Sequence, residues 1–484
     1  MMEDRKQLPE AFCMRMERLL GSEWEAFLAS YDKNRYYGLR MNPLKSSREA
    51  FREQMPFILE PVSWAEEGFY YRAEEQPGKD VLHEAGAYYI QEPSAMAVVE
   101  ILDPQPGECI LDLCAAPGGK STQIAGRMRG EGLLVANEVI PDRAKILSRN
   151  VERMGIGNCV VCSEPPERMA ELFPAFFDRI LVDAPCSGEG MFRKDETAVE
   201  QWSEAHVSMC ADRQLMILEE AVKMLKPGGG LVYSTCTFAP EENEGTVSRF
   251  LHKHGEFRIE EVPHDAAFAP GQAAWVDEPA PGIMHTMRLW PHRLKGEGHY
   301  IARLRREGAL SAPMPQRVCH MGKTQPAKAG RIAGAAQKEP TADLQDFLVK
   351  ELGLTPDWLS GQRGRVQKFG EQIYLVPVQM ISMQGIKVLR PGLHLATEKK
   401  NRLEPAHALA LALKGAQTDK VLELSQEEAQ RYLRGESLSG LTGGEQKGWT
   451  LLCRQGYPLG FGKASGGQMK NHYPKGLRRS YSYS

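Results

Sequence analysis

The chain has 484 residues, too many for one hydrophobic core, so its length predicts a main domain of about 250 to 300 residues and at least one smaller unit. Apolar residues make up 42% of the chain and charged residues 25%, which excludes a fibrous or wholly disordered protein. The sequence lacks both an apolar run of the roughly 20 residues that cross a bilayer and a signal-peptide core, so it predicts a cytoplasmic protein without membrane contact. Ten cysteines are too few for a disulfide scaffold, which makes any special cysteine more chemical than structural.

Charge is unevenly distributed along the chain. The net charge is -3, but residues 1–309 carry -14 and residues 385–484 carry +8. Residues 454–484 hold six basic side chains, no acidic one and five aromatic rings. A basic, aromatic-bearing end on an acidic body is typical of a polyanion-binding module, although a solvated surface gives the same counts.

The first segment has helical apolar periodicity and predicts a small helical cap. Its apolar stripe consists of Phe12, Met16, Leu19, Leu20, Phe27 and Leu28.

From about residue 107, short apolar runs alternate with helix-length amphipathic segments. This pattern predicts a doubly wound, Rossmann-like α/β sheet that is covered by helices on both faces. Two later runs, 284–291 and 298–306, predict an antiparallel hairpin at the sheet edge. The predicted strands of the main sheet are 109–114, 133–138, 159–164, 179–185 and 230–236.

Beyond this sheet, residues 310–338 contain no acidic or aromatic residue and no sustained period, which is typical of a linker. DLQDFLVKEL (343–352) predicts a helix. From about residue 384 the chain becomes glycine-rich, with strand-like pieces such as WTLLCRQGYPLGFGK. A separate, smaller α+β module is therefore expected at the end.

The segment LDLCAAPGGKST (111–122) predicts a strand, a tight turn and a helix. A phosphate loop of the GxxxxGK[ST] type requires glycine where this chain has Cys114, which excludes an ATPase interpretation. The GxGxxG dinucleotide pattern is also absent. The turn nevertheless lets a ligand approach the start of the helix, although an ordinary strand-to-helix turn would look the same.

Acidic residues lie at the ends of four predicted strands: Asp112, Glu138, Glu164 and Asp183. Glu138 follows Gly118 by twenty residues and can accept hydrogen bonds from both hydroxyls of a ribose. A nucleoside cofactor without a pyrophosphate is implied, and S-adenosylmethionine fits that description. The other acids line the same edge of the sheet, where open α/β folds bind ligands.

Two cysteines follow the fourth and fifth strands, Cys186 in DAPCSGEGMFRKD (183–195) and Cys236 in STCTFAPEENE (234–244). A methylase of exocyclic amino groups would instead show an Asp-Pro-Pro-Tyr type loop. C5 of a pyrimidine accepts a methyl group only after a thiolate adds to C6. Either cysteine alone is more often a small buried hydrophobe, but the pair favours C5 methylation. Cys159 and Cys162 have no second pair at metal-ligand spacing, so no metal site is expected.

Together, LDLCAAPGGKST, ANE, DAPCSGEGMFRK and STCTFAPEENE resemble the NOL1/NOP2/Sun family of RNA cytosine-C5 methyltransferases over roughly residues 5–306. HEAGAYYIQEPSAM (83–96) is similar to the family's first catalytic-domain helix, and RLWPHRLKGEGHYIARL (288–304) to its closing hairpin. The resemblance implies that Cys236 is the nucleophile, that Cys186 assists product release and that Asp183 contacts the base. Glu164 stands where the family usually has aspartate. The implied cofactor residues are Cys114, Ala115, Ala116, Pro117, Gly118, Gly119, Lys120, Glu138, Glu164 and Asp183.

The tail segments 389–413 and 456–478 resemble the PUA-like end of the bacterial small-subunit ribosomal RNA branch of the family. This resemblance implies 16S rRNA or the small ribosomal subunit as the partner, bound through phosphate contacts. The candidate phosphate-binding residues are Lys399, Lys400, Arg402, Lys463, Lys470, Lys475, Arg478 and Arg479. The expected domains are an RNA-binding cap (1–75), a methyltransferase domain (76–309), a linker (310–340), a small intermediate domain (341–383) and a PUA-like RNA-binding domain (384–484).

Three other functions are weighed against this one. A tRNA cytosine-C5 methyltransferase would share all the catalytic motifs, and a DNA cytosine methylase would share the Pro-Cys thiol but not the Cys236 motif or the tail. A ribosome-assembly factor without catalysis would bind RNA but not the cofactor. The resulting hypothesis is a monomeric, S-adenosylmethionine-dependent cytosine-C5 methyltransferase of 16S rRNA.

Overall fold

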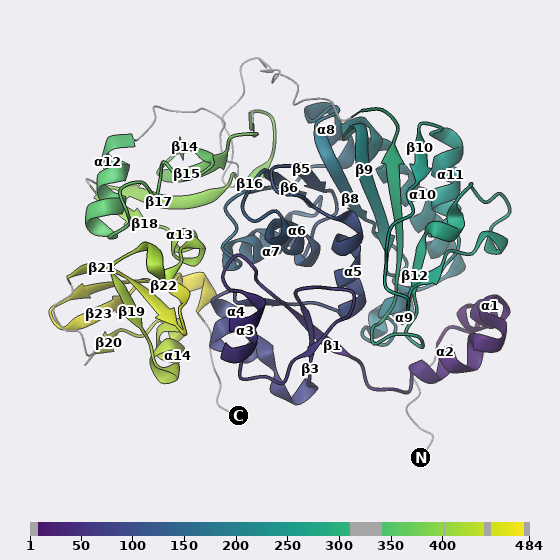
Figure 1. Ribbon diagram of the computed structural model, residues 1–484, viewed down its shortest axis with the longest axis horizontal. Coiled ribbons are helices and arrows are strands. Elements are labelled where there is room, and N and C mark those ends of the chain that lie inside the picture. Colours follow the sequence, from purple (N-terminus) through teal and green to yellow (C-terminus); the bar gives the residue numbers. More distant parts are fainter. Residues whose placement is uncertain (1–7, 310–340, 381, 401, 440–446, 479–484) are drawn as a thin grey trace.

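The computed structural model describes residues 8–309, 341–380, 382–400, 402–439 and 447–478. Four β-sheets are present in these ranges, and the largest lies at the centre of the molecule (Figure 1). Within the described residues, no helix has the length and apolar character needed to cross a membrane. The predicted linker, 310–340, lies outside the described residues.

The central sheet confirms the predicted doubly wound fold. Five parallel strands run in the order β7-β6-β5-β8-β9. The predicted edge hairpin is also confirmed, because β12 and β13 pair antiparallel and β13 lies against β9. On the opposite side, β16 pairs with β7. The strands are β5 (Cys109–Asp112), β6 (Leu133–Asn137), β7 (Cys159–Cys162), β8 (Phe177–Asp183), β9 (Leu225–Thr235), β10 (Phe257–Ile259), β11 (Ala269–Pro270), β12 (Met287–Leu289), β13 (His299–Arg306) and β16 (Val388–Arg390).

Each face of this sheet has its own hydrophobic core because side chains alternate along a strand. In β5, Leu111 packs on the side of α8, α10 and α11, whereas Ile110 packs on the side of α5, α6 and α7. These strands are buried on both faces, which explains their near-continuous apolar sequence. The helices are α5 (Pro93–Leu102), α6 (Gly119–Arg127), α7 (Pro141–Arg153), α8 (Pro166–Leu172), α9 (Glu196–Gln201), α10 (Glu204–Met224) and α11 (Glu244–Lys253).

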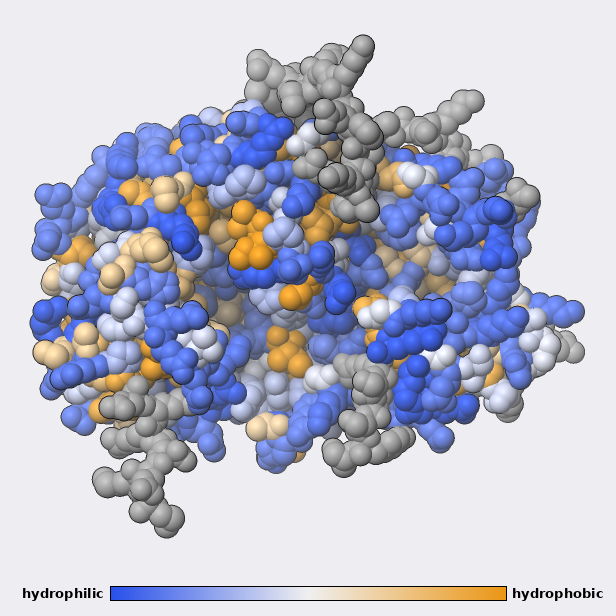
Figure 2. Space-filling model, turned by 180° about the vertical axis from the view of Figure 1, so that it is seen from behind, coloured by the Kyte–Doolittle hydropathy of each residue, from blue (hydrophilic) through white to orange (hydrophobic). Residues whose placement is uncertain are grey.

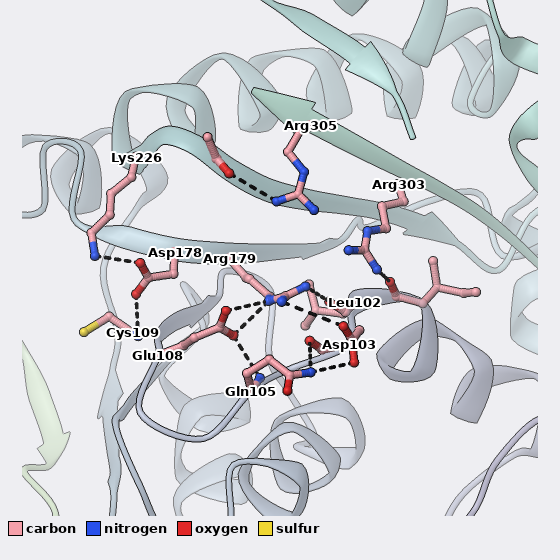
Figure 3. Close-up of polar contacts among 12 residues, drawn as sticks. Leu102, Asp103, Gln105, Glu108, Cys109, Asp178, Arg179, Lys226, Arg303 and Arg305 are labelled. Atoms are coloured by element: carbon pink, nitrogen blue, oxygen red, sulfur yellow. Dashed lines mark hydrogen bonds and ion pairs between the residues drawn. The ribbon is translucent and has the colours of Figure 1, made fainter. Parts of the chain in front are cut away.

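Ion pairs fix the amino ends of the central strands (Figure 3). Asp178 accepts hydrogen bonds from Lys226 Nζ at 2.7 Å and from the backbone N–H of Cys109 at 2.8 Å. The neighbouring Arg179 donates from Nε to Glu108 Oε2 at 2.8 Å. These contacts tie β5, β8 and β9 together at the edge opposite the predicted site, so the carboxyl ends of the strands are held in a fixed relation.

The N-terminal cap is not purely helical, which corrects the sequence prediction. Besides its helices it contains an antiparallel sheet in the order β2-β3-β1-β4, and the segment 83–96 forms a helix end, a strand and a helix start instead of one helix. The strands are short and aromatic-rich, a composition that favours β-structure but gives little periodicity. The elements are α1 (Glu10–Leu20), α2 (Trp24–Ser30), α3 (Arg48–Gln54), α4 (Val81–Glu84), β1 (Tyr37–Met41), β2 (Glu60–Pro61), β3 (Gly68–Tyr71) and β4 (Tyr88–Ile90).

Two further sheets form the C-terminal part, drawn in green and yellow in Figure 1. The first has the order β14-β15-β17-β18, so its strands lie on both sides of the expected division at residue 384. The second has the order β19-β21-β22-β23-β20 and shares a hydrophobic core with the N-terminal sheet. The elements are α12 (Thr341–Asp346), β14 (Gly364–Phe369), β15 (Gln372–Pro377), β17 (Leu393–Lys399), β18 (Arg402–Pro405), α13 (His407–Ala412), β19 (Val421–Glu423), α14 (Gln426–Arg434), β20 (Leu438–Ser439), β21 (Gly448–Arg454), β22 (Tyr457–Ser465) and β23 (Gln468–Asn471).

Candidate active site

A cavity of about 570 Å³ opens at the carboxyl ends of β5, β6, β8 and β9. Exposed apolar side chains at its rim include Val139, Ile140 and Met216. Elsewhere, Figure 2 shows that the exposed hydrophobic residues on one face of the molecule form small groups among hydrophilic ones. Six of the residues expected at the site line the cavity: Cys114, Ala116, Glu138, Asp183, Cys186 and Cys236.

The two thiols meet in this cavity. Cys186 Sγ lies 3.4 Å from Cys236 Sγ, within sulfur hydrogen-bond distance. The hydrogen bond to Cys236, together with burial, raises the pKa of the Cys186 thiol well above its ordinary value. Either sulfur can be the donor in this contact, which couples the two thiols.

Asp183, at the end of β8, is held by groups from three other elements. Lys120 Nζ in α6 donates to Oδ2 at 2.8 Å, Ser234 Oγ in β9 donates to Oδ1 at 2.8 Å, and His299 Nε2 lies 3.8 Å from Oδ1. Burial acts to raise the pKa of Asp183, but the charge of Lys120 and the contact with His299 outweigh it and hold the pKa well below its ordinary value. Asp183 is thus a fixed carboxylate beside the thiols.

A buried acid, Glu242, orients the loop that carries Cys186. Glu242 accepts hydrogen bonds from the Ser187 backbone N–H at 3.0 Å, the Ser187 hydroxyl and Gln214 Nε2 at 2.7 Å. Burial raises the pKa of Glu242 to about 7, although these hydrogen bonds oppose the shift. Glu242 lies in the motif STCTFAPEENE, but the sequence alone assigns it no role.

Glu189, in the turn Glu189–Met191, connects the thiol loops to the N-terminal helices. Fully buried, it accepts hydrogen bonds from Arg15 at 2.6 Å, from Trp202 Nε1 at 2.8 Å and from the Phe238 backbone N–H at 3.0 Å. The next residue, Gly190, donates its N–H to Cys236 O at 2.8 Å. A Cβ at Gly190 would lie 2.8 Å from the same oxygen, so only glycine allows this approach. Helix α1 therefore helps to fix the Cys236 backbone.

The glycine-rich turn is held from outside rather than by its own side chains. Gly118 has φ +112°, which L side chains rarely adopt, and precedes α6. Arg143 donates to Ala116 O at 3.0 Å and Asn150 donates to Pro117 O at 2.8 Å, both from α7. Ala115, Pro117, Gly118, Gly119 and Lys120 shape this turn, but they do not line the cavity themselves.

Family comparisons cover most of the chain. Residues 99–305 match the model of 16S rRNA methyltransferase RsmB/F, and residues 8–93 match the N-terminal domain of 16S rRNA methyltransferase RsmF. Residues 347–413 match the RsmF rRNA methyltransferase first C-terminal domain, and residues 419–479 match the methyltransferase RsmF PUA domain.

Individual proteins agree with these matches over nearly the full length. Ribosomal RNA small subunit methyltransferase F of Vibrio parahaemolyticus is 34% identical over 490 residues, covering 98% of each chain. The Shewanella baltica (strain OS155) protein of that name is 33% identical, covering 94% of this chain and 92% of its own. The chain belongs to the RsmB/F family of 16S rRNA methyltransferases.

Solved structures extend the likeness to the fold of the central region. A methyltransferase homolog protein from Pyrococcus horikoshii superimposes with a TM-score of 0.55 at 29% identity, covering 62% of this chain and 96% of its own. NSun6 from the same organism has a TM-score of 0.51 at 22% identity, covering 62% of this chain and 99% of its own, and so supports the fold alone.

S-adenosylmethionine is the methyl donor of this family, and the cavity residues fit it. Glu138 is buried; its Oε1 accepts a hydrogen bond from the Ile140 backbone N–H at 2.9 Å, and its Oε2 lies 3.4 Å from Arg143 Nη1. The remaining lone pairs of the carboxylate can accept hydrogen bonds from ribose hydroxyls. Asp112 does not line the cavity; its Oδ1 is buried without a hydrogen-bond partner among the described residues, and burial raises the pKa of Asp112 to about 7. Apolar side chains at Val139, Ile140 and Met216 provide a surface for the adenine ring.

Glu164, the residue that departs from the family pattern, is not brought to the cavity. Its carboxylate accepts a hydrogen bond from the Lys387 backbone N–H at 2.5 Å, just before β16. Glu167, which sequence reasoning did not consider, lines the cavity instead.

The expected phosphate-binding residues divide into two groups. Lys399 and Arg402, at the β17–β18 turn beside Lys400, form ion pairs with Glu371 at 3.1 Å and Glu404 at 2.7 Å. In the last sheet, Lys463 of β22 lies directly opposite Lys470 of β23, and Lys463 Nζ lies 5.0 Å from the centre of the Trp449 ring. Lys475 and Arg478 follow in the last described turn, and Arg479 lies outside the described residues.

Proposed function

We propose that this chain methylates C5 of cytosine in 16S rRNA, using Cys236 as the nucleophile, Cys186 as the thiol that assists product release and Asp183 as the contact to the target base. The distance of 3.4 Å between Cys186 Sγ and Cys236 Sγ carries the assignment. A structural pair of thiols would not need to open into the same cavity as a fixed carboxylate and a ribose-binding glutamate.

The chemistry requires a temporary bond to the pyrimidine. The target cytosine leaves its stack, and the Cys236 thiolate adds to C6, which makes C5 nucleophilic. Bound S-adenosylmethionine supplies an electrophilic methyl group to C5. Asp183, which stays ionised beside Lys120, accepts a hydrogen bond from the exocyclic amino group of cytosine and orients the ring.

Release of the product needs two more events. C5 loses its proton to solvent water, and the electron pair of that C–H bond forms the C5–C6 double bond as the bond between C6 and Cys236 breaks. The protonated Cys186 thiol lies at hydrogen-bond distance from the departing sulfur and supplies the proton that it takes up. The two thiols therefore act in succession and not as interchangeable nucleophiles.

Binding to ribosomal RNA uses the basic end of the chain. Like charges directly opposite each other in a sheet destabilise it, so the Lys463–Lys470 pair favours a bound anion. Phosphate contacts at these lysines would set affinity and register, whereas the active site selects the base. We also propose that the protein acts as a monomer in the cytoplasm.

The test is methylation by the purified protein with labelled S-adenosylmethionine. The nucleic acids compared are 16S rRNA, small ribosomal subunits from cells without this gene, tRNA and duplex DNA. We expect label only in ribosomal RNA, as 5-methylcytosine at discrete positions on bisulfite sequencing, and none with Cys236→Ala. Label in tRNA or DNA would support the corresponding alternative enzyme, and RNA binding without any label would support an assembly factor.

A further inference from the structure

His299, the first residue of β13, lies beside Asp183, and the sequence motifs assign it no role. The last pair in the β9–β13 register is Thr235 with Tyr300, so His299 and Cys236 each lie one residue beyond the end of this pairing. His299 Nε2 lies 3.8 Å from Asp183 Oδ1, and Asp183 lines the same cavity as Cys236. The fold thus places an imidazole beside the carboxylate that shares a cavity with the proposed nucleophile.

Both nitrogens of His299 face hydrogen-bond acceptors. Nδ1 lies 2.9 Å from the Gly298 carbonyl oxygen, which only accepts, so Nδ1 carries a proton. Nε2 is buried, has no hydrogen-bond partner among the described residues and lies 3.8 Å from Asp183 Oδ1. A neutral imidazole would direct its lone pair at a carboxylate, whereas an imidazolium directs an N–H at it.

The carboxylate of Asp183 has a place for this donor. Lys120 binds Oδ2, and Ser234 and His299 share Oδ1. Contact with His299 also contributes to the low pKa of Asp183. Lys120 reaches the carboxylate from α6, and Ser234 reaches it from β9. Among the described residues, His299 is the group that can donate to it from β13.

We propose that His299, in its imidazolium form, is a positioning residue that orients Asp183 toward the target cytosine. This inference rests on the proposed function. His299 acts through Asp183 when RNA is bound, by donating Nε2–H to Oδ1 after a closure of less than 1 Å, to about 2.9 Å. The base is thereby presented to Cys236 at a fixed angle, and a small misorientation there would slow the addition to C6.

The charged groups near His299 come from neighbouring elements. Asp183 from β8 attracts the imidazolium, whereas Lys120 from α6 opposes it at longer range. Glu297, two residues earlier, is paired with Arg193 at 3.5 Å. The carboxylate that faces Nε2 is therefore that of Asp183.

The experiment compares wild type, His299→Phe and His299→Gln in single-turnover methylation of 16S rRNA. The Phe variant keeps a ring but no donor, and we expect a rate about 100-fold lower with unchanged affinity for S-adenosylmethionine. The Gln variant keeps an N–H donor, and we expect it to recover most of the rate.

Two results would overturn the positioning role. These are a Phe variant at the wild-type rate and a Gln variant as slow as Phe. Wild-type cofactor affinity in the variants establishes that they are folded, and if Phe fails this check the rate of the Gln variant decides alone. The wild-type protein is tested in the same assay. If the wild type does not methylate 16S rRNA, the proposed function is refuted. If it does and the variants depart from these expectations, only the role of His299 is refuted.

Discussion

Cys186 Sγ and Cys236 Sγ lie 3.4 Å apart although 50 residues separate them in the sequence. The contact exists because β8 and β9 are parallel neighbours whose carboxyl ends coincide, with Asp183 paired to Ser234 in the register. Each cysteine then lies in a loop that is fixed by a buried acid, Glu242 for one and Glu189 for the other. The geometry of the thiol pair is therefore a consequence of sheet register and two buried carboxylates.

Glu242→Gln should change the pH dependence of stability. The pKa of Glu242 is raised from 4.5 to about 7 in the folded protein, so its favourable contribution is complete below pH 4.5 and is lost as the pH rises through 7. Glutamine can keep the bonds to Ser187 and Gln214 without a charge. We expect the variant to be more stable than wild type by up to about 3 kcal/mol at about pH 8, with the difference vanishing toward pH 4.5, in urea denaturation.

Glu242→Ala is the matched control, because it removes the hydrogen bonds as well as the charge. Leaving Gln214 and the Ser187 backbone without their acceptor should cost about 1 to 3 kcal/mol per group. A Gln variant that is less stable than wild type at high pH would contradict the raised pKa of Glu242.

Lys120→Met should leave Asp183 as a partly buried carboxylate without its strongest partner. Lys120 Nζ is 2.8 Å from Asp183 Oδ2, and 29% of the Asp183 side chain is exposed, so we expect a loss of about 1 to 3 kcal/mol after allowing for solvent screening. The pKa of Asp183 is lowered, so the wild-type advantage is present above pH 3.8 and is lost as the pH falls through the folded pKa. Lys120→Arg keeps the charge and serves as the control. Equal urea midpoints for wild type and Lys120→Met at neutral pH would refute the stabilising role of this pair.

Replacing Lys463 and Lys470 together by glutamine should weaken RNA binding and its dependence on salt. Each phosphate contact to single-stranded RNA adds about 0.7 to the slope of log affinity against log salt concentration, so losing two should lower the slope by about 1.4. The control replaces Lys145 and Lys350 by glutamine, which changes the net charge by the same amount. These two lysines form ion pairs with Asp142 and Asp346. An unchanged slope in filter-binding titrations would exclude the Lys463–Lys470 surface from the RNA interface.

The central sheet was predictable because its strands are buried on both faces and therefore read as continuous apolar runs. The strand-end positions of Asp183 and the two cysteines followed from that pattern. The contacts of Glu189 with Arg15 and of Glu242 with Ser187 join residues 174 and 55 positions apart, and a single sequence holds no signal for such pairs. The sequence places Glu164 at the end of a strand, but it does not predict where the Glu164 side chain points.

Domain limits were the least predictable feature, because short strands pair across them. The N-terminal sheet includes β4, which follows the expected limit at residue 75, and β15 pairs with β17, which follows residue 384. We propose that the domains follow the four sheets, with β16 as the strand by which the C-terminal part joins the catalytic sheet.

The most direct measurement of the thiol mechanism is a denaturing gel of Cys186→Ala after incubation with labelled 16S rRNA and S-adenosylmethionine. Without the Cys186 proton donor, release should stall, and we predict a covalent complex of protein and RNA that the double variant Cys186→Ala/Cys236→Ala does not form. A complex that forms with Cys236→Ala but not with Cys186→Ala would contradict the assigned roles and make Cys186 the nucleophile.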